Sequence, residues 1–333
     1  MLMFLASVLE QLDLALEHVS KRDVHNARFG LMLTDNAVEL FLHHLAKDRA
    51  RHLKVYTFRR ETYPHQKALD NALGRAFDAK VKFAKLEYGL TEDVARTINI
   101  MHEFRNEVYH VGIQHEAILS EITKFYLDTA CRYLGTYKPS GLSWGSNQKL
   151  PERAKKYFPN FESFMPGGYD DFGKGCVTIA NLCRHEAADT IAVLADHMDD
   201  VIQYQDSCLD EVAGGVYVGQ QTTRDEAVIG CQTWPLAFSD KGKAFAAEHG
   251  FSDKLLHLPD WLAANYPIEF RSDPIPSWEK RAAALRKQKN PHVALAQYES
   301  FMKETMTLRE EILHAAELVD AEIQSAIDRA RGK

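Results

Sequence analysis

Apolar residues spaced three and four positions apart are the feature that most constrains the fold of this chain. The pattern runs through nearly all of residues 1–138, with polar residues between the apolar positions, as in amphipathic helices. Thr91 is suited to cap the start of one such helix, and Gly112 is suited to end it. Four long helices with short loops predict a helical bundle. We expect helices at about 3–21, 25–52, 65–85, 92–111 and 115–137.

The remainder of the chain has a different character. Residues 139–175 are rich in Pro, Gly and aromatic residues, and we interpret them as a domain junction with an ordered part. Valines and glycines within 212–238 predict one or two short strands. The expected fold is mainly α, with an N-terminal bundle at 1–138 and a mostly helical regulatory or interaction domain at 176–333. Within that domain we expect helices at about 176–206, 238–251 and 292–331.

Composition places the chain among soluble globular proteins. Apolar residues make up 45% and charged residues 26% of the sequence, and no run approaches the ~20 apolar residues that span a bilayer. The apolar N-terminus has no basic leader and carries acidic residues at helical spacing, so we interpret it as a helix of the fold. The five cysteines include no CxxC pair. We therefore expect a cytoplasmic protein with neither a disulfide framework nor a metal site.

One arginine interrupts the apolar stripe of the helix that follows Thr91. Val94, Ile98, Met101 and Val108 are spaced as one helical face, and Arg105 occupies the position missing between the last two. A buried arginine costs several kcal/mol unless it is paired or meets an anionic ligand. Two interpretations stay open: a structural pair between Arg105 and a carboxylate, or an arginine that binds phosphate in a cleft.

Two neighbours of Arg105 favour chemistry on a phosphodiester. His110 lies in the last turn of the helix, where its C-terminus stabilises an imidazolium, and Asn106 shares a face with His110 at a spacing of four residues. Histidine transfers protons, and arginine stabilises charge that builds on phosphorus. RNA supplies its own nucleophile, the 2′-hydroxyl, so this chemistry requires no metal or other cofactor.

These residues carry a family resemblance over roughly 1–138. The segment "RNEVYH", residues 105–110, matches the R-x4-H motif of the HEPN superfamily of helical-bundle ribonucleases, with a polar residue after the arginine. The segment "TDNAVELFLHHLAK", residues 34–47, resembles the HEPN helix with an N-A-x-E-L-like pattern. The order of the two segments and the helix that follows them also fit.

The resemblance implies an endoribonuclease that leaves 2′,3′-cyclic phosphate and 5′-hydroxyl ends. Arg105 and His110 would be catalytic, Asn106 would support them, and two copies would form a homodimer with a composite site. It also implies a toxin or an antiviral defence effector, with tRNA as one candidate substrate. Many HEPN nucleases have a tyrosine two residues after the histidine, whereas this chain has Gly112, which puts any role of that tyrosine in doubt.

A polar strip lies on the second predicted helix. Asp35, Glu39 and His43 are spaced four residues apart and share a face. We expect Glu39 to orient Arg105, which makes it a second supporting residue. A solvated helix face is an equal interpretation, and a metal site is disfavoured because the strip lacks a characteristic ligand spacing.

A basic stretch follows the same helix. Residues 47–85 contain eleven Lys and Arg against four Asp and Glu, with aromatic residues interleaved. Cations and rings together are the composition that binds single-stranded RNA, although a charge run is more commonly a solvated face. The predicted RNA-binding residues are Lys47, Arg49, Arg51, Lys54, Arg59 and Arg60.

A function of another class also fits the sequence. The chain would then be a catalytically silent helical interaction or scaffold module of a larger complex, with Arg105 in a structural ion pair. Under either interpretation, the C-terminal half is where we expect a regulatory protein partner to bind, and we expect no membrane association.

Overall fold

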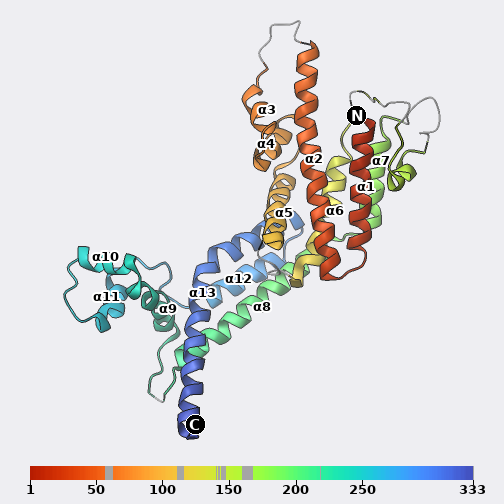
Figure 1. The fold of residues 1–333 in the computed structure, drawn as a ribbon. Coiled ribbons are helices and arrows are strands. Elements are labelled where there is room, and N and C mark those ends of the chain that lie inside the picture. The colour runs from red at the N-terminus through yellow and green to blue at the C-terminus, as the bar shows by residue number, and fades with distance from the viewer. Residues whose placement is uncertain are drawn as a thin grey trace. The chain divides into compact units, whose positions relative to one another are not determined.

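The structure is a computed structural model of the chain (Figure 1). It describes residues 1–56, 63–110, 116–139, 141, 143, 148–159, 168–217 and 219–332, with the backbone alone at 55–56 and 108–110. By their packing these residues form two compact units, 1–194 with 288–296, and 195–287 with 297–333. The first unit therefore takes in α7 (Asp171–Cys183) and η1 (Glu152–Tyr157), which follow the predicted boundary at residue 138. The division into 1–138, 139–175 and 176–333 stays a prediction.

The fold is mainly α, as predicted from the apolar spacing. The described residues form thirteen α-helices and two short 3-10 helices, and no strand occurs among them. The strands expected within 212–238 are thus wrong for the described part of that segment. There α8 (Ala187–Gly214) ends at a left-handed Gly215, and α9 (Arg224–Phe238) begins after a capping box between Thr223 and Glu226. Across the described residues, no helix combines the length and apolar character needed to cross a membrane.

The first unit is built around the long helix α2 (Val24–Tyr56). On α2 pack α1 (Leu2–Val19), α5 (Glu92–His110) and α6 (Glu116–Leu134). On the other side of the bundle, α7 (Asp171–Cys183) packs on α1 and α6, and η1 (Glu152–Tyr157) on α1 and α7. The core is aromatic and aliphatic, with Phe41 of α2 stacked on Phe172 of α7 at a centroid distance of 5.8 Å.

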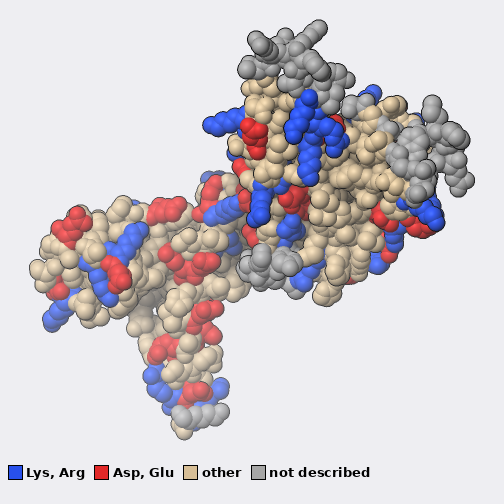
Figure 2. Space-filling view, turned by 45° about the horizontal axis from the view of Figure 1, so that its top comes forward, with Lys and Arg blue, Asp and Glu red and all other residues tan. Residues whose placement is uncertain are grey.

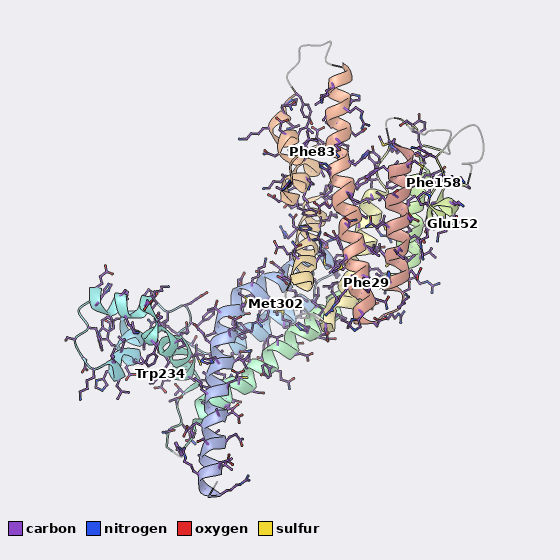
Figure 3. All side chains as sticks on the ribbon, in the orientation of Figure 1. Phe29, Phe83, Glu152, Phe158, Trp234 and Met302 are labelled. Carbon is purple, nitrogen blue, oxygen red and sulfur yellow. The ribbon has the colours of Figure 1, made fainter. Side chains whose placement is uncertain are left out.

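The short helix expected at 65–85 is two helices. These are α3 (Gln66–Ala72) and α4 (Phe77–Glu87), separated by a turn that contains Gly74. Phe83 of α4 is fully buried in a small apolar cluster with Ala46 of α2 and Leu69 of α3 (Figure 3). This cluster fixes α3 and α4 to the C-terminal half of α2, and it positions α4 beside α5.

The second unit contains α9, α10 (Asp240–Glu248), η2 (Leu255–His257), α11 (Leu258–Asn265), α12 (Ile275–Arg286) and most of α13 (Pro291–Ala330). The long C-terminal helix predicted at 292–331 is confirmed as α13. The capped helix predicted at 238–251 is confirmed as α10, where the Ser239 hydroxyl accepts from the Gly242 amide at 3.0 Å. Tyr298 and Phe301 of α13 are fully buried, and Trp278 of α12 packs edge-on against Phe301.

Candidate functional site around Arg105

Asp35 of α2 is the centre of a buried polar network in the first unit. Its carboxylate is fully buried and accepts three hydrogen bonds from two other helices. The donors are Arg105 Nε at 2.9 Å, Tyr126 Oη at 3.1 Å and His102 Nδ1 at 3.0 Å. Three donors replace the water that this carboxylate loses on burial, which makes a buried negative charge tolerable.

The network continues from Arg105 to the surface of the unit. Arg105 Nη1 donates to Asn106 Oδ1 at 2.9 Å, and Arg105 Nη2 lies 3.8 Å from Glu39 Oε2. Glu39 also accepts from Lys80 Nζ at 3.0 Å, and this lysine is only 4% exposed. The charges therefore alternate from α4 through α2 to α5, so that each buried charge faces an opposite one.

Helical spacing explains why these side chains meet. Asp35 and Glu39 are one turn apart on α2, and His102 and Arg105 are one turn apart on α5. Each pair therefore lies on a single helix face, and the two faces meet in the packing of α2 against α5. The solvated-face interpretation of the strip is wrong for Asp35, which is fully buried. The carboxylate hydrogen-bonded to Arg105 is Asp35, and Glu39 lies farther from it.

His102 is held in a defined orientation. Its ring stacks on Phe77 of α4 at a centroid distance of 3.7 Å, with the planes 4° apart. Because the Asp35 carboxylate only accepts, the hydrogen bond between them requires a hydrogen on Nδ1. Nε2 of a neutral His102 is then the nitrogen that takes up a proton. A carboxylate that fixes the tautomer of a histidine is the arrangement in which histidine acts as a general base.

Tyr126 of α6 contributes the third hydrogen bond to Asp35. Its complete burial raises the pKa of the phenol well above its ordinary value, and the neighbouring Asp35 carboxylate raises that pKa further. The phenol therefore stays protonated and donates to Asp35 at any physiological pH. Neither His102 nor Tyr126 is among the residues predicted from the sequence. The available signal for His102 was its position, three residues before Arg105 on the same helix.

The predicted catalytic pair is described only in part. Arg105 lies at the buried carboxylate with its side chain 27% exposed. The backbone of His110 ends α5, but its side chain lies outside the described residues. Asn106 Oδ1 accepts from Arg105 Nη1, and its supporting role stays a prediction.

The predicted RNA-binding residues divide into three groups. Lys47, Arg51 and Lys54 are exposed on α2, and Figure 2 shows Lys and Arg side chains gathered over α2 to α4. Arg49 instead pairs with Glu87 and lies over the ring of Tyr63 at 5.8 Å. Arg59 and Arg60 lie outside the described residues.

The described side chains include no group of three or more His, Cys, Asp or Glu placed to hold a metal ion. In comparisons with family models, curated proteins and solved structures, none matches this chain. What is known of the chemistry of the site therefore comes from its own residues.

Proposed function

We propose that this protein is a metal-independent endoribonuclease of the HEPN type, acting as a toxin or antiviral defence effector. One observation carries the proposal. Arg105 is oriented by a fully buried carboxylate, lies one helical turn from an Asp35-bound histidine, and keeps 27% of its side chain exposed. Oriented arginine and histidine side chains at the surface of a helical bundle are the groups that cleavage of RNA by its own 2′-hydroxyl requires.

The proposed reaction uses one base and one acid. A neutral histidine takes the proton from the 2′-hydroxyl, whose oxygen bonds to phosphorus while the bond to the 5′-oxygen breaks. An imidazolium returns a proton to that leaving oxygen, which yields a 2′,3′-cyclic phosphate and a 5′-hydroxyl. Each Nη of Arg105 carries two N–H groups, so a non-bridging phosphate oxygen can be bound while Nε stays on Asp35.

Two histidines of α5 are candidates for proton transfer. His110 is the residue indicated by the R-x4-H motif, and two copies of it would meet in the proposed homodimer. His102 is favoured by its hydrogen bond to Asp35. The exposed cations Lys47, Arg51 and Lys54 would bind the RNA backbone, and their contribution would weaken as salt concentration rises.

The test is cleavage of total RNA and purified tRNA in EDTA, with the product ends analysed. Wild type should yield cyclic-phosphate ends. Arg105→Lys should lose at least about 100-fold in rate, because a lysine lacks the planar fork that holds both Asp35 and a phosphate. Arg96→Lys is the matched control, since Arg96 is exposed on the same helix, and it should cleave like wild type.

Substitution of each histidine separates their roles. His110→Ala should abolish cleavage at unchanged thermal stability, and a loss with His102→Gln alone would assign the general base to the Asp35-bound ring. If cleavage survives in Arg105→Lys and in both histidine variants, the activity belongs to another site or a contaminant and the proposal fails.

A second function, a catalytically silent interaction module, is favoured by a different feature of the same site. Each of the three guanidinium nitrogens of Arg105 has a protein partner within 3.8 Å: Asp35, Asn106 and Glu39. Under this alternative Arg105→Lys lowers the stability of the protein, and neither this variant nor wild type cleaves RNA at any concentration tested. A regulatory protein partner of the C-terminal half belongs to both proposals.

A further inference from the structure

The second unit contains a cavity of about 920 Å³ between α9 and the C-terminal part of α13. Val212 of α8 and residues of α11 complete its wall. Cavities of 300–1,000 Å³ are the size that encloses a single small organic molecule. All described lining residues belong to the second unit, so the cavity is complete within it.

The walls of the cavity are aromatic and aliphatic side chains that remain open to solvent. Trp234 of α9 (Figure 3) is 51% exposed and Phe238 of the same helix is 66% exposed. Their rings stack at a centroid distance of 6.2 Å. Leu318 of α13 is 60% exposed on the wall opposite. Three large apolar side chains around one hollow leave an apolar surface that a ligand of similar character would cover.

A carboxylate that has no partner among the described residues lies in this apolar wall. Glu311 of α13 is partly buried. Burial raises the pKa of Glu311, and the neighbouring carboxylates Glu269 and Glu310 raise it further. Among the described residues Glu311 has no hydrogen-bond or ion-pair partner. The described lining also contains Glu226 and Asp260, and none of it is Lys or Arg.

We propose that this cavity binds a small organic cation, with an apolar body against Trp234 and Phe238 and an ammonium group against Glu311. The ammonium is the positively charged partner that the Glu311 carboxylate lacks among the described residues. The face of the Trp234 indole attracts the same charge, because aromatic rings are negative on their faces. An anionic ligand meets the carboxylates of Glu226, Asp260 and Glu311 here, with His314 as the one basic side chain of the described lining. A neutral ligand leaves Glu311 without a partner among the described residues.

The proposal is independent of the proposed ribonuclease activity, because it rests on residues of the second unit alone. A helix from a partner protein, with one basic residue among apolar ones, is the other occupant that an apolar groove of this charge suggests. A single small molecule is favoured because the cavity volume matches one ligand, whereas a docked helix extends over several turns.

The test is calorimetric titration of the full chain at pH 7 with three molecules that share one apolar body: 4-phenylbutylamine, 4-phenylbutanol and 4-phenylbutyrate. The amine should bind at least about tenfold more tightly than the carboxylate, with the alcohol between them. Glu311→Gln should reduce the affinity for the amine to that of the alcohol and leave the alcohol unchanged, because only the charge is removed. Equal affinity for all three, or no binding of the amine at millimolar concentration, overturns the proposal.

A second pair of variants locates the binding. Leu318→Arg introduces a cation into the cavity wall and should abolish binding of the amine. Met306→Arg is the matched control, since Met306 is also exposed on α13, at 50%, but does not line the cavity. Binding that survives Leu318→Arg overturns the assignment, as does a chain that binds a basic amphipathic helical peptide but not the amine.

Discussion

Two charge clusters of this protein have central charges of opposite sign. In the first unit a carboxylate, Asp35, is surrounded by donors from Arg105, His102 and Tyr126. In the second unit a guanidinium, Arg224, is surrounded by the carboxylates of Asp206, Asp210 and Asp273. Each cluster therefore has one central charge and three partners that come from more than one helix or loop.

Burial is what separates the two clusters. Asp35 is fully buried, whereas the Arg224 side chain is 27% exposed and Asp210 is 67% exposed. Water can replace a partner that leaves Arg224, but it has no access to Asp35. The buried cluster should therefore respond strongly to the loss of one member, and the exposed cluster should respond weakly.

The largest effect is expected for Asp35→Asn. The substitution keeps the size of the side chain but removes the carboxylate to which Arg105 Nε donates, so the arginine loses its buried counter-charge. We expect the free energy of unfolding to fall by about 3–5 kcal/mol, as when one partner of a buried ion pair is removed. Urea denaturation followed by circular dichroism measures this change.

A double variant tests the reason for that loss. If the broken pair between Asp35 and Arg105 is the cause, Asp35→Asn combined with Arg105→Met should lose less stability than the sum of the two single variants. Strict additivity, or a loss below about 1 kcal/mol for Asp35→Asn alone, would mean that the site is hydrated and that the comparison with Arg224 fails.

The same network shows how far a sequence carries such a prediction. Arg105 stood out because one charge in an apolar stripe is visible within a single helix. Its predicted partner was Glu39, whereas Arg105 Nε donates to Asp35. The two carboxylates lie one turn apart on α2, and only the axial position of α2 against α5 selects between them. His102 and Tyr126 join the site through packing between helices, which periodicity within one helix does not encode.

The helices of the second unit show the converse case. The strand prediction within 212–238 followed its valines and glycines, yet Thr223 and Glu226 stand three residues apart and form a capping box. That local signal starts α9 and outweighs the β-propensity of the valines that precede it. Local signals thus sufficed for helix ends such as Ser239 of α10, whereas contacts between helices required the structure.

The exposed cluster should respond less to the loss of its centre. Arg224→Met leaves three carboxylates near one another without a cation, and we expect a loss of about 1–2 kcal/mol, reduced by the solvent that reaches the site. Thermal denaturation at low salt measures it. Arg224→Lys keeps the charge but loses the fork of donors, so its melting temperature should lie between those of Arg224→Met and wild type.

A loss for Arg224→Met as large as that for Asp35→Asn would contradict the view that burial decides the contribution of each cluster. The carboxylates differ enough in exposure, from 21% for Asp273 to 67% for Asp210, that single Asp→Asn variants should rank in the order of their burial.

The first unit also contains a half-buried histidine that should make its stability depend on pH. His44 of α2 stacks on Phe4 at a centroid distance of 4.2 Å, and burial lowers its pKa from 6.5 to about 4. Between pH 6.5 and about pH 4, His44 therefore binds a proton in the unfolded chain but not in the folded chain. The stabilisation from the neutral ring is complete above pH 6.5 and is lost as pH falls to about 4.

We expect this loss to be about 1 kcal/mol, because solvent reaches part of the ring. His44→Phe preserves the stack on Phe4 without a titrating group, so its unfolding free energy should fall less between pH 6.5 and 4 than that of wild type. Parallel curves for the two proteins would show that other groups, such as the half-buried His185 and His292, account for the pH dependence.

The smallest effect is expected at the most exposed arginine of the comparison. Arg286 of α12 lies 2.7 Å from Asp196 and 2.6 Å from Asp199, which are three residues apart on α8, and its side chain is 46% exposed. If short distances alone decided the contribution to stability, Arg286 and its two partners would contribute as much as the pair between Asp35 and Arg105. Solvent screening predicts instead a loss of at most about 0.5 kcal/mol for Arg286→Ala, and none once salt has shortened the Debye length to about 3 Å at 1 M. Melting temperatures of wild type and Arg286→Ala at low and high salt measure both quantities.

The effect of Asp35→Asn should persist at 1 M salt because ions do not enter a buried site. A salt-insensitive loss above 1 kcal/mol at Arg286 would therefore make geometry, and not burial, the property that separates the charge clusters of this protein.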